Sequence, residues 1–513
     1  MPLQLPSSDP QPLSPGLYGT DAFHRRPLFA INGHVVASWN EAHALHGPAE
    51  LEDINPAYVA ALISGECDAQ ASPYRLIYRL PRAHHVRVGS DGVVQTHRYD
   101  PLAGGAAAME QGDLHQFLRQ GLIDHLQRTL EGHAGAIGCE HSSGLDSNAV
   151  LGGLVHGVGV DPERIHTWSR EEGGEGSLLQ TFRPFYQLKT DQCHSRELND
   201  IDCEPCLDFN QKQLEMFGAP LQLGGNTQSL AVMIQNGCTV VFSGFGGDQA
   251  ISHNAANVPT DLVAQGRWHE LRQWMGGTRA TLKTAASRAL ALSCRPWATN
   301  KVLRLTRNIY SGELLKRTLT PEGRQWLGPH LNAKKFPWEF DNYVKQHLSI
   351  RRRTLADWLA VRVEDEIRLA AFYGLEKAFP LLDEKLIGAL LQQDPVLFGE
   401  RAGSGRLLHR RAFAPFLPPI LRNNPTKMRL SMDDIEHWHA ELIKKLIKAL
   451  ELKKLSEIKL HPNIFSWWNV EDIFHEIENV LSNPEPTFSA ARGATNAITT
   501  IESLSCWCQA LDS

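Results

Sequence analysis

The sequence lacks the features that mark membrane or secreted proteins. No stretch of about 18 uninterrupted apolar residues occurs in the 513 residues, so we predict no membrane span. The N-terminus, which begins Met1-Pro2, has no basic segment followed by an apolar one, and we expect no signal peptide. Cysteine is scarce: nine residues are spread thinly from Cys67 to Cys508. This odd, dispersed set argues against a disulfide framework and favours a reducing cytoplasm.

A strong excess of charge of one sign is also absent. Lys and Arg number 51 and Asp and Glu number 57, so the formal net charge is −6. This balance gives no global field toward nucleic acid or anionic lipid, and we expect neither as a partner. Hydrophobic residues make up 42% and charged residues 21%, which excludes a mainly disordered or collagen-like chain. The length suggests about three domains at roughly 150 residues each.

The N-terminal part reads as a tail followed by short strands. Residues 1–22, rich in Pro and Ser at the start, are expected to form a loose tail. Residues 23–108 are predicted to form a small β-rich domain, because Asn32-Gly33 lies between two apolar runs as in a hairpin. Residues 74–80 alternate in polarity as half-buried strands do. A Gly/Ala run at 103–108 marks the boundary.

The remainder, 109–513, predicts an α/β domain with a helical C-terminal half. Leucines recur at helical spacing from Leu114 to Leu130, and apolar strand candidates follow at 134–139, 164–169 and 238–243. Strands that alternate with helical stretches indicate a parallel sheet with crossover helices. Residues 258–350 read as a basic helical insertion, in which 279–317 carries nine basic side chains and one acid.

A Ser/Gly-rich turn connects the first of these strands to a helix. It reads His141-Ser142-Ser143-Gly144-Leu145-Asp146-Ser147-Asn148. Small residues let the backbone close around an oxyanion, and free N–H groups at a helix start point toward it. The hydroxyls of Ser142 and Ser147 add donors, and Asp146 is placed to hold Mg²⁺ on phosphate oxygens. The turn predicts a phosphate site, and the alternative is an ordinary tight turn.

This turn resembles the pyrophosphate loop of the asparagine synthetase family, Ser-Gly-Gly-Leu-Asp-Ser-Ser. Ser143 replaces a Gly of that pattern and Asn148 replaces the last Ser. A second segment, Ser243-Gly244-Phe245-Gly246-Gly247-Asp248-Gln249, resembles the family's Ser-Gly-Asp-Gly-Gly-Asp-Glu loop. It also follows an apolar strand, which would place Asp248 beside the first loop as a second ligand of Mg²⁺.

Two later segments extend the resemblance to about 130–430. Gly374-Leu-Glu376-Lys-Ala-Phe-Pro380-Leu-Leu-Asp383 resembles Gly-x-Glu-x-Arg-x-Pro-Phe-Leu-Asp, with Ala378 in place of the Arg. The run Leu417-Pro418-Pro-Ile420 and the following Lys427 resemble the family's Leu-Pro-x-x-Ile stretch and its catalytic Lys. All four matches fall in the family's order.

The resemblance implies ATP and Mg²⁺ as cofactors and an AMP-forming amide synthetase. A carboxylate attacks the α-phosphorus, pyrophosphate leaves, and an amine then attacks the acyl-adenylate. Asp146 and Asp248 would hold Mg²⁺, Lys427 would stabilise developing charge, and Glu376 would help deprotonate the amine. The residues expected to bind the nucleotide are Ser142, Ser143, Gly144, Leu145, Asp146, Ser147, Trp168, Ser169, Gly244 and Gly246.

Each of these roles has a structural alternative. Lys427 is otherwise a solvated surface residue, Glu376 a carboxylate with a structural partner, and Trp168 part of the core. Glu366 is a second candidate for the base. Asp383 is better explained as a helix cap than as a catalytic residue. The Cys203/Cys206 and Cys506/Cys508 pairs would form a Zn²⁺ site if they met in space, and are otherwise free thiols.

The source of the amine separates this sequence from asparagine-making relatives. Glutamine-dependent members begin Met-Cys, whereas Pro2 follows Met1 and the first Cys is Cys67. We therefore expect no glutamine hydrolysis and read 23–108 as a remnant of the glutaminase domain. Branches without that Cys include β-lactam synthetases and the macrolactam synthetases of lasso peptides. Phe245 replaces the Asp of asparagine-making members.

We favour the lasso-type reaction, which joins a precursor peptide's α-amine to an Asp or Glu side chain. The expected partners are then the peptide, or a small amino-acid-derived substrate, with a leader-peptide-binding protein and a peptidase of the same pathway. The basic 279–317 stretch would help to hold them, or is a solvated helical face. The alternatives are a β-lactam-type cyclisation, amidation with free ammonia, and a non-catalytic nucleotide-binding scaffold.

Overall fold

The structure is a computed structural model of the whole chain. It describes residues 15–23, 25–64, 67–90, 94–99, 109–171, 175–197, 214, 217–222, 227–252, 258–274, 313–331, 354, 356–398, 406–423, 443–444, 446–448, 450–451, 455 and 458–512. Lys427, Cys203, Cys206 and most of the basic 279–317 stretch lie outside these residues.

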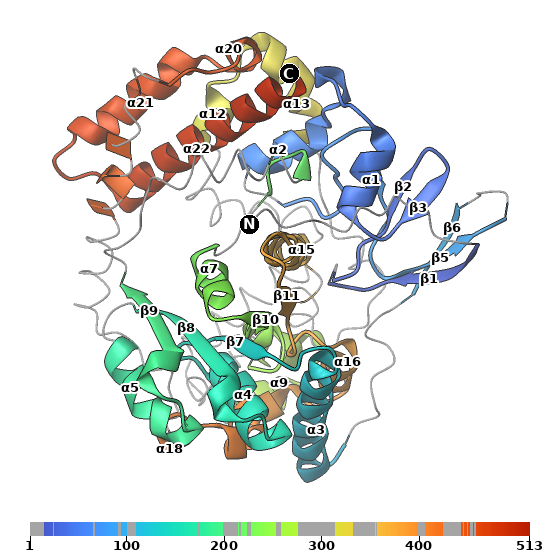
Figure 1. Cartoon of the computed structure of the whole chain (residues 1–513), viewed down its shortest axis with the longest axis vertical. Helices are drawn as coiled ribbons and strands as arrows, with labels where there is room; N and C mark the ends of the chain where they lie inside the picture. Colours follow the sequence, from blue (N-terminus) through green and yellow to red (C-terminus); the bar gives the residue numbers. More distant parts are fainter. Residues whose placement is uncertain are drawn as a thin grey trace.

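A five-stranded parallel sheet organises the lower half of the molecule (Figure 1). Its strands in chain order are β7 (Ala136–Glu140), β8 (Ile165–Glu171), β9 (Cys193–Glu197), β10 (Cys238–Phe242) and β11 (Glu376–Ala378). Their order across the sheet is β11-β10-β7-β8-β9, and every neighbouring pair is parallel. The predicted α/β class with a parallel sheet is confirmed.

Helices cover both faces of this sheet because its strands are apolar on both sides. Val240 and Phe242 pack into one core with α3 (Gln111–Leu130), α4 (Leu145–Gly152) and α5 (Glu175–Tyr186). Val241 points the opposite way and packs with α7 (Thr227–Gln235) in a second core. Adjacent residues of a strand face opposite sides, so near-continuous apolar runs are what a doubly covered sheet requires.

Two small antiparallel sheets form the N-terminal part. One has the order β1 (Gly16–Thr20), β5 (His84–Val88) and β6 (Val94–Arg98), and the other β3 (His34–Val36), β2 (Phe29–Ile31) and β4 (Tyr78–Arg79). The predicted hairpin is present, since Asn32 and Gly33 both have positive φ (49° and 78°), as a type I′ turn needs. Residues 16–20, expected in a loose tail, instead pair with β5.

Ion pairs and aromatic side chains fasten this N-terminal part to the rest. Arg79 contacts Glu364 at 2.8 Å on α15 (Asp357–Phe372), and both side chains are 3% exposed. Trp39 of α1 (Trp39–His46) and Tyr58 of α2 (Pro56–Ser64) donate hydrogen bonds to carbonyls of the 217–220 segment. The contacts are thus buried and specific, not those of a mobile appendage.

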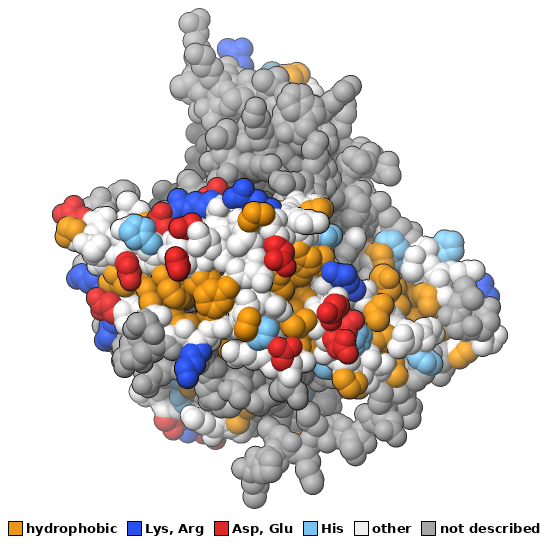
Figure 2. Space-filling model, turned by 90° about the horizontal axis from the view of Figure 1, so that it is seen from above, with side chains coloured by type: hydrophobic (Ala, Val, Ile, Leu, Met, Phe, Trp, Pro, Cys, Tyr) orange, Lys and Arg blue, Asp and Glu red, His pale blue; other side chains and the backbone are white. Residues whose placement is uncertain are grey.

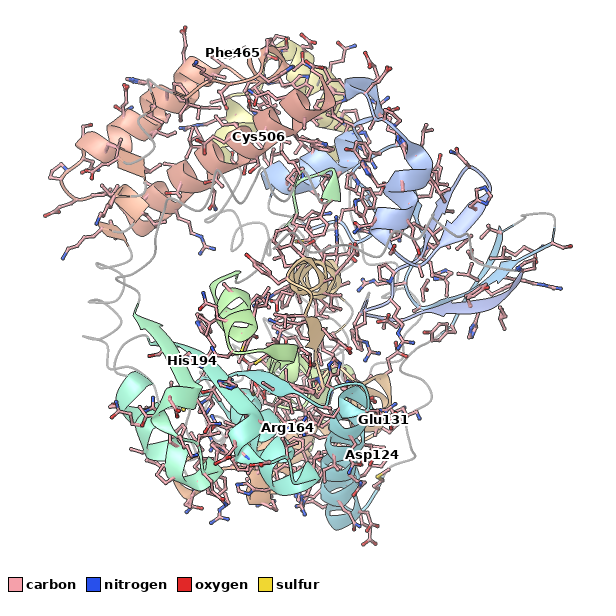
Figure 3. The ribbon with its side chains drawn as sticks, viewed as in Figure 1. Asp124, Glu131, Arg164, His194, Phe465 and Cys506 are labelled. Carbon is pink, nitrogen blue, oxygen red and sulfur yellow. The ribbon has the colours of Figure 1, made fainter. Side chains whose placement is uncertain are left out.

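C-terminal helices form a separate layer above the sheet (Figure 1). They are α20 (Pro462–Trp467), α21 (Val470–Ser482) and α22 (Phe488–Leu511), packed with α12 (Glu313–Arg317) and α13 (Pro321–Leu331). Cys506 lies in this layer, on α22 (Figure 3), and Cys508 is buried there. Among the described helices, none is both long and apolar enough to cross a bilayer.

The remaining described helices surround the sheet. They are α8 (Val258–Ala264), α9 (Trp268–Trp274), α16 (Glu384–Leu390), α17 (Leu407–Ala412) and α18 (Pro419–Asn423). On the face of the molecule in Figure 2, basic and acidic side chains are interspersed and separated by hydrophobic patches. The described part of that face therefore presents no broad surface of one charge.

Candidate active site

Both Gly-rich loops leave the sheet at the same edge. The first follows β7 and the second follows β10, and these two strands are hydrogen-bonded parallel neighbours. The order in which strands are added to the sheet also reverses here, because β8 and β9 lie on one side of β7 while β10 and β11 lie on the other. Parallel α/β sheets bind ligands at this kind of switch point, beyond the carboxyl ends of the strands.

The first loop is closed by its own hydrogen bonds. The backbone N–H of Ser142 donates to Ser147 Oγ at 3.1 Å, and that of Gly144 donates to Ser142 Oγ at 3.2 Å. The side-chain amide of Asn148 donates to the carbonyls of Ser142 and Gly144, both at 2.7 Å. Asn148, which replaces the family's last Ser, thus fixes the shape of the loop.

Buried polar side chains hold the Asn148 side chain in place. Its Oδ1 accepts from the hydroxyl of Tyr186 at 2.9 Å and lies 3.1 Å from His141 Nε2. Burial lowers the pKa of His141 to about 4, although the Asn148 contact opposes this. His141 is therefore neutral at pH 7, and the network assigns its proton to Nε2. The sequence motif gave no sign of Tyr186, which comes from α5.

The second loop lies directly against the first. A Cβ added at Gly244 would stand 2.5 Å from the backbone N of Ser147. One added at Gly247 would stand 2.3 Å from Asp146 Oδ1. Gly246 has a φ of +98°, a left-handed conformation that glycine adopts freely. Gly244 and Gly246, predicted to bind nucleotide, therefore have packing and conformational roles in the structure, and Gly247 joins them.

This close packing brings the two predicted metal ligands together. The hydroxyl of Ser252 lies 2.9 Å from Asp146 Oδ2 and 3.3 Å from Asp248 Oδ1. A single hydroxyl shared by both carboxylates places them within a few ångströms of each other. Ser252, four residues after Asp248, carried no signal in the sequence.

Two side chains from the N-terminal end of α17, Arg406 and His409, complete the cluster. Arg406 forms an ion pair with Asp248 Oδ1. His409 Nε2 lies 3.2 Å from Asp146 Oδ1, yet neither atom has a hydrogen-bond partner of acceptable geometry. Asp146 Oδ1 is thus a buried carboxylate oxygen that lacks a hydrogen-bond donor. Such an oxygen, beside a second carboxylate, suits a hard divalent cation, so the residues fit Mg²⁺.

Trp168 and Ser169 sit on β8 next to this edge. Trp168 is only 6% exposed and belongs to the core on the α7 side. Its carbonyl accepts the backbone N–H of His141 at 2.8 Å. The structural alternative given above for the Trp168 side chain is therefore what the structure shows, and any contact with an adenine would come from the backbone of this strand.

Glu376 lies at the opposite edge of the sheet. It is the first residue of β11 and pairs in register with Val240, whereas the loops begin beyond Phe242. Its carboxylate contacts His133 Nε2 at 3.0 Å, and His133 precedes β7. The structure does not bring Glu376 to the two loops, because a strand carries its first residue at the amino edge. Asp383 caps α16 by accepting two backbone N–H groups.

Glu366, the rival for the base, belongs to a buried ion network on α15. It contacts Lys377 at 3.1 Å and Arg362 at 2.8 Å, and Lys377 also pairs with Glu140 at the end of β7. Burial alone would lower the pKa of Lys377, but the two carboxylates outweigh it and raise that pKa. Burial likewise opposes ionisation of Glu140, yet Lys377 brings its pKa below the ordinary value.

Phe245 forms an aromatic wall beside the second loop. Its ring lies at about right angles to Trp358 and Phe379, with centroids 6.1 and 6.0 Å away. The guanidinium of Arg362 stands 4.2 Å from the ring centroid. The position at which asparagine-making members carry Asp is thus apolar and covered by a cation.

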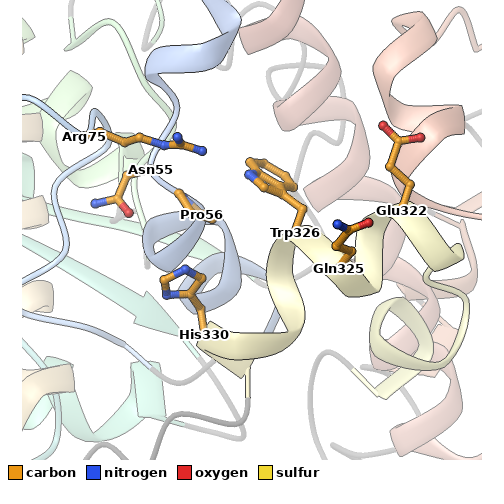
Figure 4. A pocket seen from close by; sticks show the side chains of 7 residues that line it. All are labelled: Asn55, Pro56, Arg75, Glu322, Gln325, Trp326 and His330. Carbon is orange, nitrogen blue, oxygen red and sulfur yellow. The ribbon is translucent and has the colours of Figure 1, made fainter.

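A separate hollow lies between α2 and α13 (Figure 4). Its volume is about 670 Å³, and it is lined by Asn55, Pro56, Arg75, Glu322, Gln325, Trp326 and His330. None of the predicted site residues lines it. The chemistry is better placed at the two loops, where the carboxylates converge.

Comparison with known proteins gives one family match, which covers just under half of the chain. The family model of asparagine synthase matches residues 217–466. That range contains the second loop, α15, β11 and Lys427. No curated protein matches the chain. The match supports an asparagine synthetase-like family and, at the family level, an ATP-dependent carbon–nitrogen ligase that forms amides.

Proposed function

We propose that the chain is an AMP- and pyrophosphate-forming amide synthetase that adenylates a carboxylate and joins it to an amine without hydrolysing glutamine. The observation that carries this proposal is the convergence of Asp146 and Asp248 on the Ser252 hydroxyl. The two carboxylates come from loops 102 residues apart, at adjacent strand ends. A fold that needed the loops only as turns would have no reason to bring both carboxylates into one partly buried cluster.

In this proposal each candidate site residue has a role that follows from its position. Asp146 and Asp248 would hold Mg²⁺, which when bound neutralises phosphate oxygens. The backbone N–H groups at the start of α4 face the same edge and would receive the pyrophosphate. Lys427, from the matched family range, would supply a further positive charge near the reacting groups.

We propose the precursor-peptide reaction as the specific activity, namely ring closure between an N-terminal amine and an Asp or Glu side chain. Support comes from Phe245 with Trp358 and Phe379, which form an apolar wall next to the second loop. A Phe at this position offers neither a charge nor a hydrogen bond to the polar groups of a free amino acid, which favours a different substrate.

Nucleotide binding is the first test. Calorimetry should show Mg-ATP binding to the wild type and at least tenfold weaker binding to Asp146→Ala, while Asp124→Ala binds normally. Asp124 is a matched control, since it is an exposed aspartate on α3 (Figure 3). Normal binding by Asp146→Ala would refute the site.

Product analysis is the second test. A candidate precursor peptide with a free N-terminus and an internal Asp or Glu, incubated with Mg-ATP, should lose one water while AMP and pyrophosphate accumulate. ADP and phosphate as products, or glutamate released from added glutamine, would contradict the proposal. A peptide with an acetylated N-terminus should not cyclise.

A further inference from the structure

Two side chains from one short segment reach both carboxylates of the candidate metal site. Arg406, which directly precedes α17, contacts Asp248, and His409, one turn later, contacts Asp146. The Arg406 side chain is 11% exposed and that of His409 is fully buried. The Arg406 guanidinium therefore already contacts one of the two carboxylates that would hold Mg²⁺.

Several buried polar atoms at this contact lack hydrogen bonds. Neither ring nitrogen of His409 has a hydrogen-bond partner, and neither has Asp146 Oδ1, although all three atoms are buried. Buried polar atoms in a stable core are almost always hydrogen-bonded. Arg406 also has a φ of +67°, a left-handed backbone that is rare for a residue with a side chain. Strain and unsatisfied atoms in one place point to an arrangement that changes when a ligand arrives.

We propose that Arg406 is an exchangeable counter-ion of the metal site, an inference that rests on the proposed function. Without nucleotide, its guanidinium neutralises Asp248 and opposes binding of a divalent cation. A nucleotide draws the guanidinium onto its phosphate oxygens, which match the planar fork of Arg. Asp248 then loses its contact with the Arg406 cation and can bind the metal, so metal and nucleotide bind with positive coupling.

Metal binding without nucleotide isolates the first half of this exchange. Mn²⁺, titrated alone and followed by electron paramagnetic resonance, should bind Arg406→Gln roughly tenfold more tightly than the wild type, a factor within the usual range of coupling between sites. The matched control is Arg411→Gln, which removes the same charge from an exposed position of the same helix and should bind Mn²⁺ as the wild type does.

Nucleotide binding without metal isolates the second half. Calorimetry with ATP in the presence of a chelator should show roughly tenfold weaker binding to Arg406→Gln, and again no change for Arg411→Gln. Arg406→Gly serves as a second variant, because glycine accepts the positive φ and the protein should fold at least as well as the wild type. It should behave as Arg406→Gln does in both titrations.

An unchanged or weaker Mn²⁺ affinity in both variants would overturn the exchange, and so would an unchanged affinity for ATP. Failure of the proposed function has a different signature, which is absence of Mg-ATP binding by the wild type itself. In that case the titration with Mn²⁺ alone still decides whether Arg406 competes with a cation at Asp248.

Discussion

The contact between the two loops can be broken at a single position, Gly247. A Cβ there would stand 2.3 Å from both Asp146 Cγ and Oδ1, whereas ordinary contact begins at 3.4 Å. The obstacle is about 1 Å deep and lies on the side chain that we assign to the metal. The φ of Gly247 is not positive, so alanine fits its backbone and the substitution tests the contact alone.

Gly247→Ala should therefore affect both stability and binding. Overpacking a close contact costs about 1–3 kcal/mol, which a denaturant titration should detect. Displacement of the Asp146 carboxylate should weaken Mg-ATP binding at least tenfold, or about 1.4 kcal/mol, in calorimetry.

The control is Gly132→Ala, in the turn after α3. An added Cβ at Gly132 meets nothing within 4 Å, so its stability should stay within about 0.5 kcal/mol of the wild type and its Mg-ATP affinity should not change. If Gly247→Ala melted and bound nucleotide like the wild type, the loops would not touch as described, and the metal assignment would lose its basis.

Three further substitutions test the surroundings of the site by denaturant unfolding. Asn148→Ala should cost about 2–4 kcal/mol, because two loop carbonyls and the buried Tyr186 hydroxyl each lose one hydrogen bond; a loss below 1 kcal/mol would contradict the network. Lys377→Met should cost about 3–5 kcal/mol at pH 7, because it removes the buried cation that Glu140 and Glu366 share. Lys189→Met, at an exposed pair, should leave stability nearly unchanged, and equal losses would show that burial does not matter here. The pKa of Asp383 is about 2, because hydrogen bonds from His125 and the start of α16 outweigh the effect of burial. Its ionised form should therefore contribute about 2 kcal/mol of stability above pH 4, which is lost as the pH falls toward 2. Asp383→Asn should flatten the dependence of the unfolding free energy on pH in this range, and an unchanged dependence would refute the assignment.

Local features of the fold could be predicted from the sequence. The strand candidates at 134–139, 164–169 and 238–243 became β7, β8 and β10. The last of them carries three successive apolar residues at 240–242, as a strand covered on both faces requires. Asn32-Gly33 became a tight turn because Asn and Gly both tolerate the positive φ that this turn requires. The 74–80 stretch was less well predicted, since only Tyr78–Arg79 is a strand, while Tyr74 packs among Trp39, His43, His46 and Trp507. Alternating polarity does not distinguish a strand from an extended segment that buries one aromatic ring.

The site was predicted only as far as the loops themselves. Arg406 and His409 lie more than 150 residues beyond the second loop, and nothing in their spacing marks them as partners of its carboxylates. Glu376 shows that a motif identifies a residue type but not the edge of the sheet at which the residue lies. The parallel register of β11 on β10 decides that edge, and pairing over a separation of more than 100 residues is not readable from periodicity.

The ion network around Lys377 and the cluster around Asp146 both lie next to the loops, but the first has a structural role and the second suits ligand binding. In the network around Lys377, both oxygens of Glu366 are engaged, Oε1 by Arg362 and Oε2 by Lys377, and both side chains of the Lys377–Glu366 pair are less than 10% exposed. Because both of its oxygens are already engaged by cations, Glu366 is better suited to position the loop edge than to act as the base. The cluster around Asp146 has the opposite character, with buried nitrogen and oxygen atoms left without hydrogen bonds. Because an incomplete polar cluster is costly, its persistence is most simply explained by a ligand that completes it.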